Sequence, residues 1–526
     1  MLIMRSIKKN TILVIIVVLA VIIGADLRFK DLEKRPMHTD EAVQASRLGN
    51  LIENNEFEYN PKDGHGPGLL YLSLPITWLK KINNYQGLNE TTLRMVPAFY
   101  GTLLIISMLL FKRLIGSVGV AVAALLVALS PMHVYYSRYF IMEIPLIILL
   151  SLFLFCCWKY FCDQRFRWML CAGLCCAFMH SIKETFIISV TALTISYVIL
   201  FIWEEITKRK GARLQTRPLI KNTAISLIAT LLVSAALYSL FFTNIEAIGQ
   251  SFLTYFDYIK RAEGSGHEKP FWYYIQLLTW KKMELYTWSE LFIIALAIIG
   301  AVSSFTIKGL SIKEQIFIRS LSLYTVITLG IYSSINYKTP WSILPFLHGA
   351  ILLAGFGFWT LWKIKNESKL TNVAIKGSLL STLVFFPWML YKQDQIANFK
   401  FPANADRNPY VYSHTSPSLV NKLVKDVNEL NGIKNDLSIS VYHPEFGWPL
   451  PYYFRNIPKS GYHQNVTSQT NSDVIIADSS YEDQIATIIG DRYIGPDLMN
   501  LRDNVMLHYY IEKELFFEMV NRRSQK

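Results

Sequence analysis

The sequence is poor in charged residues for its length. Only 17% of its 526 residues are Asp, Glu, Lys or Arg, whereas soluble domains carry about 25%. In their place, 52% of the residues are hydrophobic, and the chain has 12 Trp, 29 Tyr and 31 Phe. This composition excludes intrinsic disorder, a collagen helix and a long coiled coil, and it is too apolar for a series of soluble domains.

Cysteine is also scarce, and its placement excludes a disulfide framework for the polar segments. All six cysteines lie between Cys156 and Cys176, inside or beside apolar runs. A metal site at Cys171, Cys175 and Cys176 would lack a suitably spaced His or acidic partner, so packing between helices is the favoured interpretation. The sequence also lacks a Walker A motif and a Gly-x-Gly-x-x-Gly after a strand, which leaves nucleotide-driven transport without support.

Long apolar runs are what the sequence has in abundance. A helix needs about 20 residues to cross a bilayer. The apolar runs predict about eleven membrane helices, although several runs are shorter than this or are interrupted by Pro and Gly. They lie at residues 11–25, 93–111, 118–135, 144–161, 168–182, 185–203, 223–243, 290–306, 318–335, 341–362 and 372–391. We therefore expect an α-helical polytopic membrane protein.

The basic residues agree with this topology. A net charge of +13 would suggest nucleic-acid binding in a soluble protein, but here every second short connection is basic, as the positive-inside rule requires. The first run has no small-x-small cleavage pattern and is interpreted as a retained signal anchor. We predict a plasma-membrane protein with a cytoplasmic N-terminus and an outside C-terminus. The basic residues concerned are Arg5, Lys8, Lys9, Lys112, Arg113, Arg165, Arg167, Lys208, Arg209, Lys210, Arg213, Arg217, Lys221, Lys308, Lys313, Lys363, Lys365 and Lys369.

Three segments outside the membrane are large. The first outer loop, 26–92, contains an apolar run from Leu69 to Lys81 that predicts an amphipathic helix along the interface. The second, 244–289, is rich in the aromatic residues typical of an interfacial belt. The third is the tail, 392–526, which follows a membrane domain at 1–391 and has a soluble composition.

The tail is predicted to be a small extracytoplasmic α/β domain. Ser416-Pro417 has the features of a helix start, and the helix is expected to end near Asn431-Gly432. Residues 437–442 and 473–477 predict buried strands, and residues 481–489 predict a following helix.

An acidic pair in the first outer loop is the first candidate for chemistry. Asp40-Glu41 follows the first span by about fifteen residues, and acidic residues close to a membrane are often functional. Neighbouring residues on a helix point about 100° apart, so one carboxylate can act as general base while the other orients the loop or a metal ion. The alternative is a solvated helix start with Asp40 as the N-cap.

Two further outer connections carry charge. Arg138 and Glu143 lie in the stretch from Ser137 to Pro145, and a simple ion pair is the alternative to a functional role. Lys183-Glu184 follows the fifth run, where a lysine can bind a phosphate near the lipid headgroups. The alternatives are that Lys183 pairs with Glu184 or extends to the interface.

The remaining candidates are His65 in a Gly-rich loop, Lys338 and Trp341 at an outer helix end, and His348 about two turns into the tenth run. We include them, with His38, Arg138, Lys183 and Glu184, as substrate-binding candidates. Carboxylates, cations and aromatic residues on one side of a membrane suit transfer from a phosphate-bearing lipid, because the carboxylate removes the acceptor proton and the cations stabilise the departing phosphate.

The order of these motifs resembles the GT-C glycosyltransferases, and within them the protein O-mannosyltransferase and lipid A aminoarabinose transferase group. The likeness is greatest to a prokaryotic branch described as flippase-activity-associated in archaeal glycosylation clusters. The stretches that carry it are Arg35–Val43, His65–Tyr71, Ser137–Pro145, Lys183-Glu184, Pro340-Trp341 and Pro409–Pro417.

The resemblance implies a polyprenyl-phosphate-sugar donor, an extracytoplasmic protein or glycolipid acceptor, and inversion at the anomeric carbon. It implies Asp40 as catalytic base beside Glu41, Glu143 as second catalytic acidic residue, and Lys183 with Arg138 at the phosphate. Glu143 stands where mannosyltransferases usually have Asp, which leaves open a divalent ion (Mg or Mn) held by Asp40 and Glu143. A flippase-associated protein that binds lipid-linked sugar without catalysis is the alternative.

Overall fold

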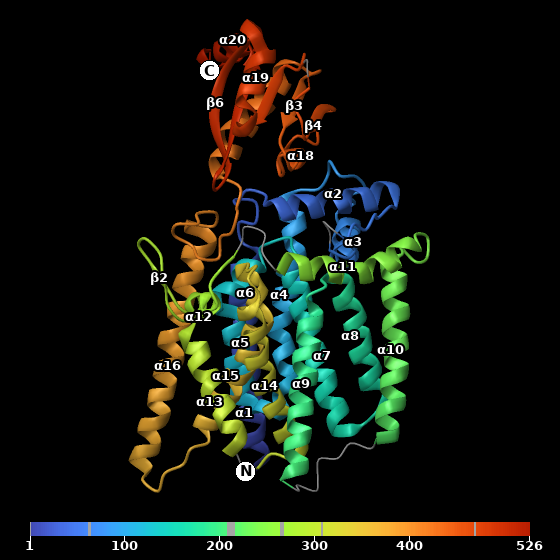
Figure 1. Ribbon diagram of the computed structural model, residues 1–526. Coiled ribbons are helices and arrows are strands. Elements are labelled where there is room, and N and C mark those ends of the chain that lie inside the picture. The colour runs from blue at the N-terminus through green and yellow to red at the C-terminus, as the bar shows by residue number, and fades with distance from the viewer. Residues whose placement is uncertain are drawn as a thin grey trace.

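The computed structural model describes residues 2–61, 65–207, 216–262, 268–306, 309–467 and 470–525. It consists of a bundle of long helices with a small mixed domain at one end (Figure 1). Parts of the predicted motifs lie outside the described residues, namely Asp63-Gly64, the basic residues at 208–213, and Lys308. The side chains of Arg5, Lys8 and Lys9 are outside them as well.

The long helices run side by side, which confirms the polytopic helical class (Figure 1). Eight ranges of the described residues are long and apolar enough to cross a membrane, and one of them, 90–129, contains two helices. Two further apolar helices, α8 and α13, are shorter, so the count of eleven stays a prediction. The helices are α1 (Leu2–Phe29), α4 (Glu90–Ser107), α5 (Lys112–Leu129), α7 (Glu143–Asp163), α8 (Phe166–Ile182), α9 (Phe186–Ile206), α10 (Thr216–Tyr238), α13 (Leu291–Thr306), α14 (Ile312–Ser334), α15 (Leu344–Trp362) and α16 (Lys369–Gln395).

Helix α15 is the centre of the bundle, since most of its residues are buried. Small residues let its neighbours approach closely, as is common between membrane helices. A Cβ on Gly355 would lie 2.6 Å from the carbonyl oxygen of Gly119 in α5, and a Cβ on Gly357 would lie 2.3 Å from that of Leu296 in α13. Larger side chains at these two glycines would push α15 away from its neighbours.

Shorter elements cover the end of the bundle next to the small domain. In Figure 1, α2 (Thr39–Asn54) and α11 (Glu246–Ala262) lie across the ends of the long helices. The helix predicted near Leu69 is α3 (Gly68–Leu79), but it is apolar on most sides instead of amphipathic. The amphipathic helix is α11, whose Phe252 and Phe256 are exposed, as in helices that lie in a membrane interface. The other elements at this end are α6 (Pro131–Tyr136), α12 (Tyr273–Thr279), β1 (Lys281–Lys282), β2 (Thr287–Trp288) and η2 (Pro340–Ile343), whereas η1 (Met108–Phe111) joins α4 to α5 at the opposite end.

The C-terminal domain is a mixed α/β structure, as predicted. Its five-stranded sheet has the order β4-β3-β5-β7-β6, with β3 parallel to both its neighbours and β7 antiparallel to both of its own. The predicted strands are β3 (Ser438–Tyr442) and β5 (Val474–Asp478), and the predicted helices are the turn at Leu419–Val424 with α17 (Lys425–Ile433), and α19 (Glu482–Ile489). The sequence interpretation missed α18 (Leu450–Tyr453), β4 (Lys459–His463), β6 (Tyr493–Arg502), β7 (Val505–Glu512) and α20 (Lys513–Ser524).

The hydrophobic core of the helix bundle extends further along the chain than the predicted domain boundary at residue 392, which falls inside α16. Tyr410 and Val411 belong to the core of the helix bundle, whereas the core of the C-terminal domain begins at Leu419. The segment between α16 and Ser418 is therefore part of the membrane domain by packing. The N-terminus lies at the opposite end of the bundle from the C-terminal domain (Figure 1).

Candidate active site

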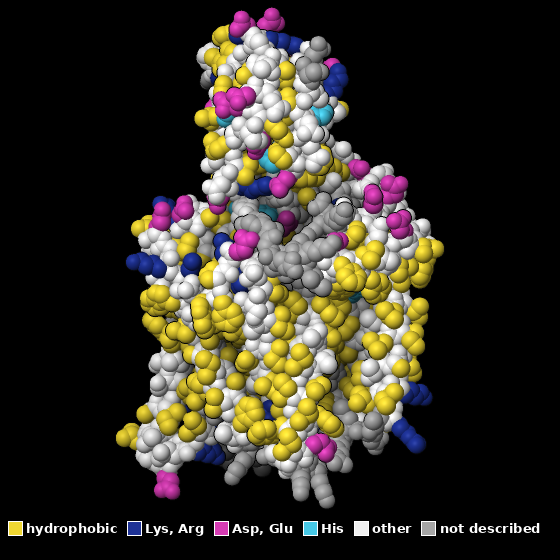
Figure 2. All heavy atoms as spheres, in the orientation of Figure 1, with side chains coloured by type: hydrophobic (Ala, Val, Ile, Leu, Met, Phe, Trp, Pro, Cys, Tyr) yellow, Lys and Arg dark blue, Asp and Glu magenta, His cyan; other side chains and the backbone are white. Residues whose placement is uncertain are grey.

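Several of the predicted site residues meet where the helix bundle faces the C-terminal domain. Figure 2 shows basic, acidic and His side chains in a recess at this junction, while the faces of the long helices are largely apolar. The recess is bordered by the start of α2, the connection between α6 and α7, the end of α8 and the segment that precedes the C-terminal domain.

Helix α2 begins with a capping box that orients the acidic pair. His38 is the N-cap, and its Nδ1 accepts a hydrogen bond from the backbone N–H of Asp40 at 3.0 Å. Glu41 completes the box by accepting from the backbone N–H of His38 at 3.0 Å. The alternative that Asp40 is the N-cap is therefore wrong. The Asp40 side chain is 48% exposed, and its carboxylate lies 3.8 Å from His38 Nδ1.

Glu41 has the opposite environment, since its side chain is fully buried. Its carboxylate accepts from Arg94 Nε at 2.8 Å, from Arg94 Nη2 at 2.7 Å and from the backbone N–H of Phe140 at 2.8 Å. Burial by itself raises the pKa of Glu41, but the Arg94 guanidinium outweighs it and holds the pKa well below its usual range. Glu41 therefore fixes the loop in place and has no free oxygen for a substrate.

Arg138, predicted to bind substrate, instead caps the end of α1. Its guanidinium donates to the carbonyl oxygens of Leu27 at 2.9 Å, Lys30 at 2.6 Å and Asp31 at 3.1 Å, and it lies over the ring of Phe399. Carbonyls at a helix end have no partner within the helix, so this arginine satisfies them. The role of Arg138 in substrate binding stays a prediction, while its hydrogen bonds show a structural role at the end of α1.

Lys183 and Glu143 form a buried ion pair at the recess. Lys183 follows the last residue of α8 in an extended conformation, and Glu143 is the first residue of α7. The ammonium donates to Glu143 Oε1, while Glu143 Oε2 is buried without a hydrogen-bond partner among the described residues. An ammonium group has three donors, so the pair leaves Lys183 able to bind further oxygen atoms.

Glu184 does not pair with Lys183, so that alternative is wrong. Its carboxylate is almost fully buried and accepts from the Tyr59 hydroxyl at 3.2 Å. The other oxygen lies 2.8 Å from His65 Nδ1. These contacts join the Gly-rich loop of the first outer segment to the end of α8, beside Lys183.

Aromatic rings line the same region, and one comes from the tail. Trp341 packs edge-on against His38, Tyr136 and Tyr412 with ring centroids 5.5–6.2 Å apart. Because His38 Nδ1 accepts a hydrogen bond, its Nε2 carries the proton and donates to the carbonyl oxygen of Tyr412 at 3.2 Å. Burial raises the pKa of Tyr412, and the nearby Asp40 carboxylate adds to this shift. Tyr412 was missed as a site residue, although it lies in the stretch Pro409–Pro417 that carried the resemblance.

Two predicted binding residues, Lys338 and His348, are buried. The Lys338 ammonium is buried and donates to the backbone carbonyls of Lys269 and Ile335. His348 is fully buried within the bundle, and neither of its ring nitrogens has a partner among the described residues; its ring lies 6.4 Å from that of His133. A substrate contact for either residue stays a prediction.

The described part of the chain contains no group of three or more His, Cys, Asp or Glu side chains arranged to hold a metal ion. The Asp40 carboxylate lies 3.8 Å from His38 Nδ1, and Glu143 is bound to Lys183. The residues present therefore do not fit the divalent site that the sequence left open at these two carboxylates.

The Asp40 loop and the Lys183–Glu143 pair are joined through the connection before α7. The backbone N–H of Phe140 binds Glu41, and Glu143 follows three residues later. Three residues span at most about 11 Å of extended chain. The Asp40 loop and the Lys183–Glu143 pair are therefore joined by a short stretch of chain.

Comparison with known proteins relates this geometry to a family. Residues 69–245 match the family model for dolichyl-phosphate-mannose-protein mannosyltransferase. No curated protein sequence matches the chain significantly.

Similar solved structures cover nearly the whole chain. ArnT from Cupriavidus metallidurans bound to undecaprenyl phosphate is 12% identical, with 94% of this chain and 97% of that chain covered and a TM-score of 0.62. Its apo state gives 11% identity, 95% and 98% coverage and a TM-score of 0.63. The oligosaccharyltransferase of Archaeoglobus fulgidus is 12% identical, with 95% and 76% coverage and a TM-score of 0.53. The chain thus has a fold similar to these membrane proteins, and over residues 69–245 its sequence is similar to the mannosyltransferase family.

Proposed function

We propose that the protein transfers a sugar from a polyprenyl-phosphate donor to a hydroxyl group at the outer face of the membrane. The observation that carries this proposal is the contrast within the acidic pair. Glu41 is buried and saturated with hydrogen bonds, whereas the neighbouring Asp40 carboxylate is half exposed at the recess. A scaffold that holds one free carboxylate in a fixed position is suited to general-base catalysis.

In the proposed reaction, the acceptor hydroxyl oxygen attacks the anomeric carbon of the donor sugar while Asp40 takes its proton. The bond between the anomeric carbon and the phosphate oxygen breaks, and its electron pair leaves with the polyprenyl phosphate. Direct displacement inverts the anomeric centre, through a transition state with oxocarbenium character. No covalent intermediate with the protein is needed.

Lys183 is proposed to bind the departing phosphate. Its ammonium is held by Glu143 and has donors left for phosphate oxygens. A positive group placed where negative charge develops stabilises the transition state more than the ground state. Glu143 is thus a positioning residue for Lys183, which differs from the role of second catalytic acid that the resemblance implied.

The aromatic residues are proposed to hold the sugar. Tyr412 is half-buried beside Trp341 and near Asp40. Aromatic faces bury apolar surface while a hydroxyl group serves as a polar handle, which suits the two kinds of surface on a sugar ring. The acceptor is proposed to be a protein hydroxyl or a glycolipid of the cell envelope, which would reach Asp40 from the recess beneath the C-terminal domain (Figure 2).

The test compares Asp40→Asn with Glu56→Gln, an exposed carboxylate of the same outer loop. Purified variants in nanodiscs are incubated with envelope lipids and proteins from cells that lack this protein, and mass spectrometry follows sugar transfer and the release of polyprenyl phosphate. We expect Asp40→Asn to abolish both and Glu56→Gln to retain them. Full activity of the Asp40→Asn variant would refute the assignment of Asp40 as the general base. Wild-type protein that binds polyprenyl phosphate but never transfers sugar would favour the flippase-associated alternative.

A further inference from the structure

One edge of the sheet in the C-terminal domain lies against the start of α2. Strands β4, β3 and β5 run parallel, so their carboxyl ends share this edge, and β6 ends there as well. The Thr39 hydroxyl, at the start of α2, donates to the carbonyl oxygen of Trp448 at 3.4 Å and accepts from Arg502 Nη1 at 3.2 Å. Because Thr39 precedes Asp40, this edge of the sheet borders the proposed base (Figure 1).

The connections of the sheet change sides at this edge. After β3 the chain forms α18, whose Leu450 packs in the same hydrophobic core as Val441. After β5 it forms α19, whose Ile485 packs with Tyr442 in a second core. Val441 and Tyr442 are neighbours in β3 and point to opposite faces, so the two connections leave on opposite sides. In open sheets with parallel strands, ligands bind at the carboxyl ends of the strands where this happens.

His443 and Asp478 stand at this point, because His443 directly follows β3 and Asp478 ends β5. His443 is only 3% exposed, and its Nδ1 accepts from the backbone N–H of Glu445 at 2.9 Å. Its Nε2 therefore carries the proton. This nitrogen lies 3.5 Å from Asp478 Oδ2, yet it has no hydrogen-bond partner among the described residues. Burial lowers the pKa of His443, so the imidazole is neutral near pH 7 and offers one N–H to a ligand.

A hydroxyl group is the ligand that fits this pair. Asp478 Oδ1 is occupied, since it accepts from the backbone N–H and the hydroxyl of Ser480 at 2.9 and 2.6 Å. Oδ2 is the oxygen near His443. One hydroxyl group can accept from His443 Nε2 and donate to Asp478 Oδ2 at the same time. An anion would be repelled by the carboxylate, and an ammonium group could not accept from the imidazole N–H.

The loop after β3 adds a charged pair and an aromatic ring. Glu445 and Arg502 form an ion pair at 2.5 Å, and besides burial both charges act on the pKa of His443. Phe446 is 43% exposed and has a φ of 58°, which a bulky side chain rarely adopts. Backbone strain of this kind is concentrated at ligand sites. Donors and acceptors beside an exposed ring suit a sugar, which has several hydroxyl groups and an apolar ring face.

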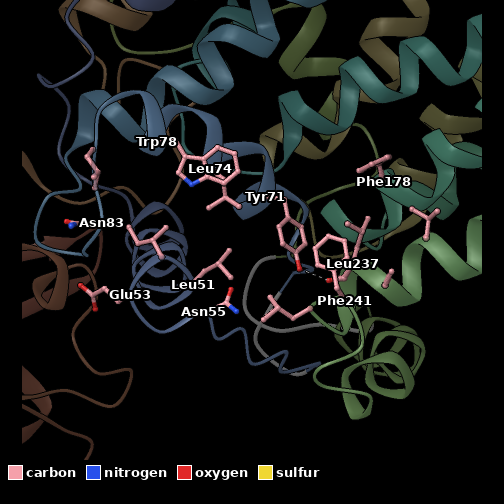
Figure 3. Close-up of a pocket in the computed structure, with 15 residues that line it drawn as sticks. Leu51, Glu53, Asn55, Tyr71, Leu74, Trp78, Asn83, Phe178, Leu237 and Phe241 are labelled. Atoms are coloured by element: carbon pink, nitrogen blue, oxygen red, sulfur yellow. Dashed lines mark hydrogen bonds between the residues drawn. The ribbon is translucent and has the colours of Figure 1, made fainter.

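The cavity of about 900 Å³ in the membrane domain is unsuited to such a ligand. Apolar side chains such as Leu51, Trp78 and Phe178 line it (Figure 3). Its Tyr71 hydroxyl is already used on the carbonyl oxygen of Leu237 at 2.9 Å. A sugar inside it would lose most of its hydrogen bonds to water without replacement.

We propose that this edge of the C-terminal domain binds a carbohydrate, and that this carbohydrate carries the hydroxyl group that attacks the donor. The binding residues are His443, Glu445, Phe446, Asp478 and Arg502. The inference rests on the proposed function for the reaction itself. It adds a place for the acceptor and selects a glycan, such as the sugar part of a glycolipid, over a protein hydroxyl. Arg502 also contacts Thr39, so one residue joins the bound carbohydrate to the loop of Asp40.

The first experiment measures binding without catalysis. Full-length protein in nanodiscs is mixed with chitobiose, mannobiose, lactose or a Thr-rich peptide, and saturation-transfer NMR identifies the ligand protons that contact the protein. We expect binding of at least one disaccharide and none of the peptide. Asp478→Asn should weaken this binding about tenfold, because Asn has a single acceptor oxygen and needs it for Ser480. Asp436→Asn, just before β3 at the opposite edge of the sheet, is the matched control.

A second variant removes the ring and keeps the fold. Phe446→Gly relieves the backbone strain, since glycine adopts positive φ readily, and it should weaken disaccharide binding about fivefold. The proposal would be overturned if the wild type bound no disaccharide, if it bound the peptide instead, or if Asp436→Asn had the same effect as Asp478→Asn.

The transfer assay separates this inference from the proposed function. Envelope material from cells that lack this protein is the acceptor, and the products are digested with protease before mass spectrometry. We expect the transferred sugar on glycans, and a higher KM for the acceptor in Asp478→Asn with an unchanged KM for the donor. Sugar on protein hydroxyls would overturn the carbohydrate acceptor and leave the proposed function standing. Disaccharide binding with no transfer by the wild type would refute the proposed function and leave the carbohydrate site standing.

Discussion

Replacing Glu41 by Gln tests whether Glu41 contributes only to stability, while its neighbour Asp40 carries the chemistry. The substitution keeps the shape of the side chain but removes the charge from a buried group that accepts four hydrogen bonds. It leaves the Arg94 guanidinium, which is 1% exposed, without its anion. Arg94 keeps its hydrogen bonds to the carbonyls of Leu32, Arg35 and Pro36. The substitution therefore removes the ion pair with Glu41 but not these hydrogen bonds.

The size of the effect follows from burial. Removing one partner of a buried ion pair costs about 3–5 kcal/mol, because the other charge stays buried and unpaired. Asp40→Asn changes a side chain that is 48% exposed, and such surface substitutions usually stay within about 0.5 kcal/mol. We therefore expect Glu41→Gln to lower the free energy of unfolding by several times more than Asp40→Asn, although the two residues are adjacent.

The dependence on pH has a defined sign. The pKa of Glu41 is lowered in the folded state, so the folded state binds fewer protons than the unfolded state near the ordinary Glu pKa of about 4.3. The stabilisation is then complete above that pKa and declines as the pH falls below it. The difference between wild type and Glu41→Gln should therefore be constant near pH 7 and shrink below about pH 4.

The assay is denaturant unfolding in nanodiscs, followed by Trp fluorescence, with sugar transfer measured on the same samples. Glu56→Gln is the matched control. The double variant Glu41→Gln/Arg94→Gln should lose less than the sum of the single variants, because the two side chains share one network. Glu41→Gln with wild-type stability and no activity would refute the reasoning, since it would give Glu41 a chemical role.

Two further predictions concern other charges. Lys183→Gln should weaken the binding of undecaprenyl phosphate at least about tenfold, because a hydrogen bond to a charged group contributes about 1.5–3 kcal/mol, and fluorescence titration would measure it. Arg138→Lys should lower the free energy of unfolding by about 1.5–3 kcal/mol, because a lysine ammonium cannot bind all the carbonyls that the guanidinium binds at the end of α1. The KM for the donor should stay unchanged in the folded fraction.

The membrane helices could be predicted because a single local property determines them. Residues 144–161 and 185–203 were expected from apolar length alone, and they correspond to α7 and α9. The interfacial helices were harder. Apolar residues in α3 suggested an amphipathic helix that the structure does not have, whereas the true one, α11, was hidden in a segment interpreted as an aromatic belt.

The partners of the charged residues could not be predicted from one sequence. Arg94 lies within the apolar run expected at 93–111, and its partner Glu41 is 53 residues away. Lys183 has an acidic neighbour in sequence, yet it pairs with Glu143, 40 residues away. Such pairs depend on how helices pack, and local spacing carries no signal for them. The partners of Arg138 could not be predicted either, because a guanidinium can bind a phosphate as well as the free carbonyls at a helix end.

Burial separates the outer charges into two groups with different consequences. Arg94, Arg138 and Glu41 use their hydrogen-bonding groups on the protein and fix the loops, while Asp40 is left exposed on a helix start that cannot shift. One imidazole links this helix start to the tail, because His38 Nδ1 accepts from Asp40 while Nε2 donates to the Tyr412 carbonyl. A rotation of His38 that broke either bond would break the other. The position of the exposed carboxylate therefore depends on the segment before the C-terminal domain as much as on α2 itself.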